Sequence, residues 1–140
     1  MLTEDACGEE IETLHGFFVQ WYRGEHSRDR FARVERALAP EFERITPEGA
    51  IAGRETVLAG VREGYNTYDP DSCDIEIRHV TPVEIREGRA LVRYEEWQTM
   101  DGETTGRLST ALFGPSASQQ GTASGVEWRY LQETWLDSGE

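Results

Sequence analysis

The sequence predicts an α+β domain in which three helices precede a curved antiparallel sheet. Two observations predict it. Apolar residues recur every three or four positions up to about residue 65, and after Pro70 the period changes to two. Helices followed by a run of strands are typical of the α+β class. With 140 residues the chain has the length of one domain, residues 1–140, and can fold without a disulfide or a metal.

The first half of the chain predicts three helices and a short hairpin. Helical spacing of apolar residues places the helices at residues 9–23, 28–39 and about 54–65. Ser27 is expected to cap the second helix and Pro40 to end it, because proline cannot continue a helix. A short apolar alternation on both sides of Pro47 predicts two short strands around a turn.

The second half predicts a four-stranded meander. The first of its strands begins after Pro70 and is expected to break or bulge at Pro82. The second strand, ALVRYEEWQTM, ends at Asp101-Gly102, which is the strongest hairpin signal in the chain. The strands GRLSTALF and VEWRYLQETWL follow, and the small polar segment 115–124 between them is expected to be a surface loop.

A two-residue turn at Asp101-Gly102 fixes the register of the central hairpin. The opposite pairs that it predicts include Tyr94–Ser109, Glu96–Arg107 and Trp97–Gly106. The face that carries Glu96 grades from apolar to polar, as expected for the wall of a cavity that opens at one end. Alternate residues of the last strand are expected to extend this wall, namely Trp128, Tyr130, Gln132 and Thr134.

The charge of the chain limits its partners. It has 27 acidic and 14 basic residues, every basic residue is Arg, and the net charge is −13. Such a charge repels phosphate backbones, so nucleic-acid binding is disfavoured. The acid excess suggests the hypothesis of a salt-adapted protein whose self-repulsion is screened by salt. A GC-rich genome would also replace Lys with Arg, although it would not explain the acid excess.

The sequence predicts no metal site, no cofactor and no membrane association. Cys7 and Cys73 are the only cysteines and are expected to be free thiols, and the three histidines are scattered. No apolar run is long enough to span a bilayer, and the acidic start MLTEDACGEE does not have the pattern of a targeting peptide. We therefore expect a cytoplasmic protein.

Four stretches carry a resemblance to a known family: LAPEFERITPEGAIAGRETVL, GRALVRYEEW, GRLSTALF and EWRYLQETW. Their order, with the helices, resembles the SnoaL-like (DUF4440-like) branch of the NTF2-like superfamily over a core of about residues 9–136. The resemblance implies a cone-shaped fold, with three N-terminal helices packed on a strongly curved mixed or antiparallel sheet, a pocket between them and often a homodimer. It does not fix a chemistry, because the superfamily includes enzymes, binding modules and scaffolds. Many relatives carry His-x-His where Gln132 and Thr134 stand here.

Glu96 and Arg107 are the leading functional candidates. Glu96 could act as a general base while Arg107 holds a substrate carboxylate or oxyanion, or the two could form only a cross-strand ion pair. His79 has the same parity as Ile75 and Ile77, so it is expected to point inward as a second acid–base candidate. A lone inward histidine is more often a satisfied core residue.

The remaining candidates are polar or aromatic residues expected near the pocket. The predicted ligand-binding residues are Trp21, Tyr22, Tyr65, Tyr94, Arg107, Ser109, Trp128, Tyr130 and Gln132. A packed polar core is the alternative.

Two functions stay open: a binding protein or acid–base enzyme (isomerase, dehydratase or hydrolase) for a small, partly apolar organic molecule, or a non-catalytic dimeric scaffold. An open pocket walled by Glu96 and Arg107 would favour the first.

The opposite face of the sheet predicts a homodimer. Its apolar residues are Leu91, Trp97, Leu108, Leu112, Leu131 and Trp135. An apolar patch of that size usually marks an interface. Charged residues of both signs, Arg93, Glu95, Arg129 and Glu133, lie between them and could pair across a two-fold axis. The alternative is that the helices cover this face.

Overall fold

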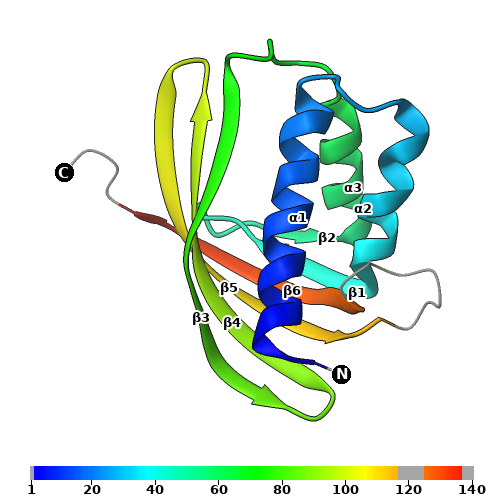
Figure 1. Cartoon of the computed structure of the whole chain (residues 1–140), viewed down its shortest axis with the longest axis vertical. Coiled ribbons are helices and arrows are strands. Elements are labelled where there is room, and N and C mark those ends of the chain that lie inside the picture. Colours follow the sequence, from blue (N-terminus) through cyan, green and yellow to red (C-terminus); the bar gives the residue numbers. More distant parts are fainter. Residues whose placement is uncertain (1, 117–124, 137–140) are drawn as a thin grey trace.

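The computed structural model describes residues 2–116 and 125–136 as helices packed on one face of a six-stranded sheet (Figure 1). The helical elements are α1 (Glu4–Tyr22), the 3-10 turn η1 (Arg28–Phe31), α2 (Ala32–Ala37) and α3 (Arg54–Glu63). The strands are β1 (Leu38–Ile45), β2 (Ile51–Gly53), β3 (Cys73–Arg86), β4 (Arg89–Met100), β5 (Glu103–Pro115) and β6 (Val126–Leu136). The predicted α+β class, with three helices and a mixed sheet, is confirmed.

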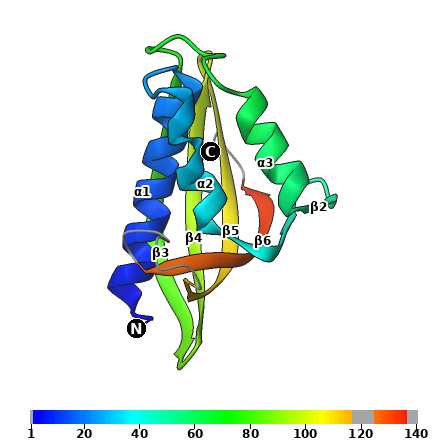
Figure 2. The same cartoon turned by 90° about the vertical axis from the view of Figure 1, so that its right-hand side faces the viewer.

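The strands are ordered β2-β1-β6-β5-β4-β3 across the sheet. Strands β3 to β6 form the predicted antiparallel meander, whereas β1 runs parallel to β6 and makes the sheet mixed. In Figure 2 the helices stand in front of β3, β4 and β5, so one face of the sheet is covered and the other is not. The helices and the covered face therefore enclose the interior, and we call the covered face the inner face.

The central hairpin has the predicted register. Asp101 and Gly102 have φ values of 52° and 85°, as a type I′ turn requires. Tyr94 lies opposite Ser109, Glu96 opposite Arg107, and Trp97 opposite Gly106. A methyl group on Gly106 would lie 2.5 Å from the Trp97 ring, so this glycine leaves the room that the indole fills.

The helices differ from the prediction at their ends. Helix α1 begins at Glu4 rather than residue 9, because the Thr3 hydroxyl accepts the N–H of Ala6 at 3.0 Å and caps it. Ser27 bonds the Asp29 side chain and makes no cap. The second helical segment begins as a 3-10 turn and ends at Ala37, so Pro40, expected to end the helix, lies within β1.

A bulge in β6 overturns part of the predicted cavity wall. Trp128 faces Phe113 on the inner face, but Leu112 pairs with Tyr130, so Arg129 is an extra residue. One extra residue reverses the alternation of a strand. Leu131 and Glu133 therefore point inward, and Tyr130 and Gln132, predicted to bind ligand, belong to the opposite face.

A second irregularity lies in β3, where Pro82 was expected to disturb the strand. The register shifts between Arg78 and Thr81 and again after Pro82. Within the first shift His79 has a φ of 56°, and its side chain is exposed. The expectation that His79 points inward is therefore wrong, because the shift breaks the period of two that it shared with Ile77.

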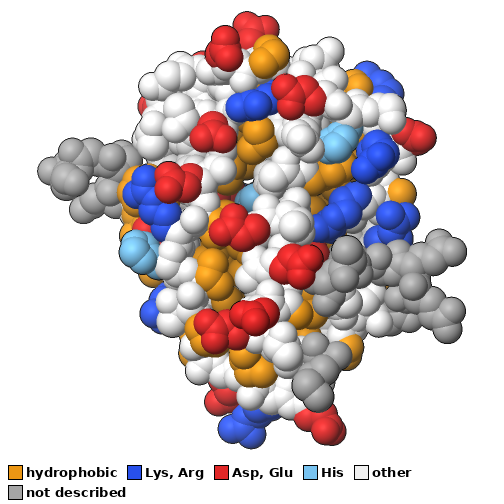
Figure 3. Space-filling model, viewed as in Figure 1, with side chains coloured by type: hydrophobic (Ala, Val, Ile, Leu, Met, Phe, Trp, Pro, Cys, Tyr) orange, Lys and Arg blue, Asp and Glu red, His pale blue; other side chains and the backbone are white. Residues whose placement is uncertain are grey.

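The surface carries the acid excess unevenly. Figure 3 shows acidic side chains spread over the face viewed, with one group of basic side chains at its right-hand side and others at its left edge and lower end.

None of the helices in the described part of the chain is long and apolar enough to cross a membrane.

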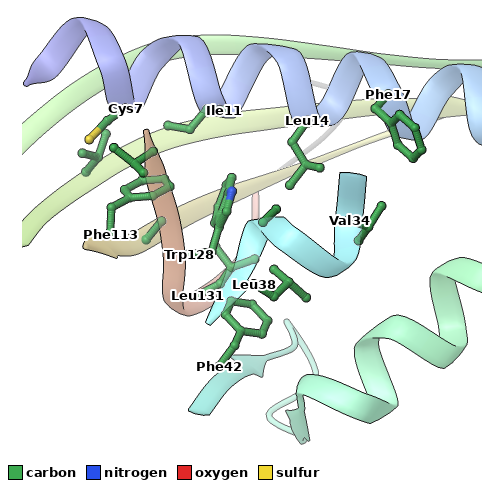
Figure 4. Close-up of a cluster of buried hydrophobic side chains, with 14 of the residues drawn as sticks. Cys7, Ile11, Leu14, Phe17, Val34, Leu38, Phe42, Phe113, Trp128 and Leu131 are labelled. Carbon is green, nitrogen blue, oxygen red and sulfur yellow. The ribbon is translucent and has the colours of Figure 1, made fainter. Parts of the chain in front are cut away.

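The core joins α1 to the inner face of the sheet. Figure 4 shows Ile11 and Leu14 of α1 lying over Trp128 of β6, with Phe42 of β1 beyond it. All four side chains are at most 3 % exposed. Burial of this apolar area is the main term that fixes the helix on the sheet. The same packing sets the positions of the polar residues that lie among these side chains.

Candidate functional site

A cavity of about 140 Å³ lies between the helices and the inner face of the sheet. Its apolar lining comes from all three helices and from β1, β3 and β6: Leu14, Phe18, Tyr22, Val34, Leu38, Phe42, Val57, Val61, Ile75, Trp128 and Leu131 (Figure 4). Its polar lining consists of His15, Arg44, Gln98, Glu96, Arg107 and Glu133. The cavity is thus largely apolar with one group of charged side chains, which is the usual composition of a small-molecule site.

His15 and Glu96 form a buried pair in the wall of this cavity. Helix α1 places His15 four residues after Ile11, on the face that packs on the sheet, and β4 places Glu96 on the inner face. The His15 Nε2 and Glu96 Oε1 atoms are 3.1 Å apart, and each residue is 5 % exposed. On its other side, the His15 ring bonds the Ile11 carbonyl through Nδ1 at 2.7 Å.

The hydrogen bonds define where the protons are. A carbonyl oxygen can only accept, so Nδ1 of His15 carries a proton and donates it to Ile11. Glu96 also accepts a hydrogen bond from the side-chain amide of Gln98, at 2.6 Å. If Glu96 is ionised, both of its oxygens accept, and Nε2 must carry a proton as well. The ring is then a cationic imidazolium that faces a carboxylate.

The electrostatics favour this ionised form. Burial by itself would lower the pKa of His15, but the Glu96 carboxylate and the hydrogen bonds outweigh it and the pKa is raised above 6.5. Burial would likewise raise the pKa of Glu96, but the charge and hydrogen bond of His15 lower it to about 2. Both shifts favour the ionised form of the pair, which is held away from water.

Glu133 forms a second charged group beside the first. Arg44 of β1 donates to Glu133 Oε1 at 2.7 Å through Nε, and its second nitrogen lies 2.6 Å from the same oxygen. Arg107 of β5 donates to that oxygen at 3.3 Å. Glu133 is 5 % exposed, so two arginines compensate one buried carboxylate.

The predicted ion pair between Glu96 and Arg107 is wrong as a direct contact. The two residues face each other in the register, but within the described residues each bonds a different partner: Glu96 pairs with His15, and Arg107 with Glu133. The Nε atom of Arg107 is buried and has no hydrogen-bond partner in that part of the chain. Both residues still line the same cavity, as expected.

Some of the other predicted ligand-binding residues line the cavity, and others pack elsewhere in the core. Tyr22 and Trp128 line the cavity. Trp21 and Tyr65 belong to the packing instead: the Trp21 indole donates to the Val61 carbonyl at 2.7 Å, and the Tyr65 hydroxyl to the His26 carbonyl at 2.6 Å. They were expected at the pocket because they lie on helices that cover the sheet, but they point toward other helices and loops.

Tyr94 and Ser109 lie opposite each other on the inner face, next to the Glu96 and Arg107 pair. Both are fully buried and neither lines the cavity. Burial raises the pKa of the Tyr94 hydroxyl well above its ordinary value, and the nearby Glu96 carboxylate adds to the effect. Tyr94 is therefore a neutral hydroxyl behind the cavity wall.

Gln98, at the polar end of the predicted wall, does line the cavity, whereas three polar residues of the site were not predicted: His15, Arg44 and Glu133. A signal for His15 was present, since it stands four residues after Ile11 and three before Phe18, on the apolar stripe of α1. A polar residue on such a stripe needs a buried partner. Glu133 gave no signal, because its inward direction depends on the bulge in β6.

The structure offers no evident metal centre in residues 2–116 and 125–136. No group of three or more His, Cys, Asp or Glu side chains there is arranged to hold an ion. The side chains of the cavity wall themselves offer charge, hydrogen bonding and exchange of one proton between His15 and Glu96.

Comparison with known proteins identifies the family and the fold. The sucrose-6-phosphate phosphohydrolase C-terminal family matches residues 7–137. An NTF-2 like protein of unknown function from Pseudomonas aeruginosa superposes with a TM-score of 0.83 at 24 % identity, over 94 % of this chain and 99 % of that one. A protein with a cystatin-like fold from Caulobacter vibrioides has a TM-score of 0.63 at 17 % identity, over 95 % and 89 % of the two chains.

The CaMKII hub of S. rosetta has the same fold, with a TM-score of 0.62 at 13 % identity over 94 % of this chain and 92 % of that one. No curated protein matches the sequence. These likenesses confirm the predicted NTF2-like cone fold. The SnoaL-like branch stays a prediction, since the matched proteins do not distinguish it.

The ion pair predicts a specific pH dependence of stability. The raised pKa of His15 contributes stability that is complete below pH 6.5 and is lost as the pH rises through the folded-state value. The lowered pKa of Glu96 contributes stability that is complete above pH 4.5 and is lost as the pH falls toward 2. We therefore expect the coupling energy between the two residues to be largest between pH 4.5 and 6.5.

The measurement is a double-mutant cycle of urea unfolding with His15→Gln and Glu96→Gln from pH 3 to 9. Each single variant is expected to lose about 3 kcal/mol at pH 6, the usual cost of leaving a buried charge unpaired. The exposed pair Glu84–Arg86 is the control, and Glu84→Gln should cost well under about 1 kcal/mol. A coupling energy that stays constant across the pH range would contradict the ion pair.

Proposed function

The chain belongs to the sucrose-6-phosphate phosphohydrolase C-terminal family, and we propose that it binds a small, partly apolar organic molecule in the cavity between helices and sheet. The observation that carries this proposal is the pair of buried ionic groups in the lining of an otherwise apolar cavity. Burying charges is costly, and a core of the same shape could be filled by apolar side chains. A cavity lined by charged groups is therefore expected to hold a ligand that contacts them.

The volume limits the size of the ligand. A cavity of about 140 Å³ is close to the roughly 150 Å³ of an engineered apolar cavity that holds benzene. It is well below the roughly 300 Å³ at which sites for drug-sized molecules begin. A ligand of about one ring, with one or two polar substituents, fits this space.

The unused hydrogen-bonding capacity of the lining indicates the polar group. Glu96 and Glu133 already accept hydrogen bonds from their neighbours, whereas Nε–H of Arg107 has no acceptor among the described residues. A buried donor without a partner costs free energy until an acceptor arrives. The ligand should therefore carry an acceptor oxygen, as a phenol, a ketone or a carboxylate does.

Binding is better supported than acid–base catalysis. A general base works best when its pKa is near the working pH, and a pKa of about 2 makes Glu96 a weak base. Catalysis by Glu96 would require a substrate that displaces His15 from it. His79, the other predicted catalytic residue, is exposed and does not line the cavity.

Ring-sized probes test the proposal. We expect phenol and cyclohexanone to raise the melting temperature and to shift NMR signals of cavity residues in a saturable way, and benzene to bind more weakly because it lacks an acceptor. Leu131→Trp, which fills the cavity, should abolish binding of all three probes. Leu108→Trp, on the uncovered face, should leave it unchanged. Absence of binding to the wild type, or undiminished binding to Leu131→Trp, would refute the proposal.

We also propose that the uncovered face of the sheet forms a homodimer. Register and burial place five half-buried apolar residues on it: Leu91, Trp97, Leu108, Leu112 and Tyr130. The bulge in β6 removes Leu131 from the predicted set, and Trp135 shares the side of Arg107, whose guanidinium lies over its ring. The shared fold with a CaMKII hub supports an assembly but does not define its geometry.

Sedimentation at several concentrations, in low and in molar salt, tests the dimer. The wild type should be a dimer, and Trp97→Glu combined with Leu112→Glu should be a monomer, because two charges would be buried without partners. Val83→Glu, which changes an exposed apolar residue outside this set, should remain a dimer. A monomeric wild type at every concentration would rule the dimer out, and a dimer that survives the double substitution would place the interface elsewhere.

A further inference from the structure

A second concave site lies on the other side of α1 from the cavity. It has a volume of about 560 Å³ and is formed by α1 together with the segment that contains η1 and α2. Its polar lining includes Thr13, Gln20, His26, Arg30, Arg33 and Arg36. We call it the arginine groove. The proposed cavity uses Leu14, His15 and Phe18 of α1, so the two sites occupy different faces of one helix.

The groove concentrates positive charge in an acidic protein. The chain has a net charge of −13, yet three arginines stand at three-residue spacing along this wall. Asp29 is the acidic residue in the described lining. Figure 3 shows a group of basic side chains over the region of η1 and α2, beside a histidine. The charged residues of the lining therefore carry a net positive charge, opposite in sign to that of the chain.

Two of these arginines are available to a ligand. Arg33 is occupied: it donates to the two oxygens of Glu10 at 3.1 and 3.2 Å and to the Thr13 hydroxyl at 3.2 Å. Arg30 and Arg36 are exposed and have no acidic partner among residues 2–116 and 125–136. Other arginines of this chain, such as Arg44, do pair with one of its many carboxylates. The two guanidinium groups therefore retain their full capacity to bind an anion.

His26 adds an unsatisfied polar atom to the same wall. Its ring stacks on Phe17, with centroids 4.6 Å apart and planes at 19°, and this contact fixes its orientation. The Nε2 atom is buried and has no hydrogen-bond partner in the described residues. Burial and the charge of Arg30 lower the pKa of His26, which keeps its ring neutral at neutral pH. A neutral ring can hydrogen-bond an uncharged part of a ligand.

We propose that the arginine groove binds a small molecule that carries an oxyanion such as a phosphate. Arg30 and Arg36 would hold the oxyanion, because the planar guanidinium matches its oxygens with two parallel hydrogen bonds. His26 and Gln20 would contact the remainder of the molecule. The volume of the groove falls within the roughly 300–1,000 Å³ of small-molecule sites, so it has room for more than the anion itself.

Titration of the whole chain with inorganic phosphate at constant ionic strength tests the site. We expect saturable NMR shifts of amides in η1 and α2, and an affinity that falls about tenfold or more in the Arg30→Gln and Arg36→Gln double variant. Acetate, a monoanion, should bind more weakly at the same amides. Both arginines are exposed, so the fold should persist, and circular dichroism checks that it does.

The matched control is the Arg89→Gln and Arg93→Gln double variant. It makes the same change in net charge, and both arginines are exposed on β4, away from the groove. Phosphate affinity in this control should stay within about twofold of the wild type. Three results would overturn the site: no saturable phosphate binding to the wild type, an equal loss in the control, or unchanged affinity in the groove variant.

Discussion

The ion pair between His15 and Glu96 is the interaction on which the arrangement of the interior depends. It joins α1 to β4 across 81 positions of sequence and stands in the cavity wall among apolar side chains. Removing two charges from water costs several kcal/mol each, and their attraction repays this only when the geometry is good and the remaining hydrogen bonds are made. The Ile11 carbonyl and the Gln98 amide supply those bonds. The pair therefore adds a specific contact to the apolar packing that holds α1 on the sheet, and it keeps one side of the cavity polar.

The bulge in β6 decides what surrounds that pair. By turning Glu133 inward it brings a second buried carboxylate to the cavity, and Arg44 and Arg107 converge on it from β1 and β5. Three strands are thus tied together at the wall that faces His15. The same bulge turns Tyr130 outward, where it extends the apolar area of the uncovered face. One extra residue therefore shapes both the cavity and the surface proposed for association.

Much of the fold could be predicted because its determinants are local. The Asp101-Gly102 turn set the hairpin register, which placed Glu96 and Arg107 on one face with Tyr94 and Ser109. Side-chain partners could not be predicted in the same way, because they depend on how separate elements meet: Glu96 pairs with a helix residue and Arg107 with a residue beyond a bulge. His79 and Arg129 stand where the register of a strand shifts, and such shifts leave no periodic signal in the sequence. The residues of β6 after Arg129 were therefore predicted to lie on the wrong face.

The most direct test of this account is the protonation state of His15, read from the nitrogen NMR shifts of its imidazole ring at neutral pH. With Glu96 ionised, both ring nitrogens carry protons, since one faces the Ile11 carbonyl and the other the Glu96 carboxylate. The two shifts should therefore be those of an imidazolium, and Glu96→Gln should convert them to those of a neutral ring. A neutral His15 ring in the wild type at pH 7 would contradict the buried ion pair and with it the polar wall of the cavity.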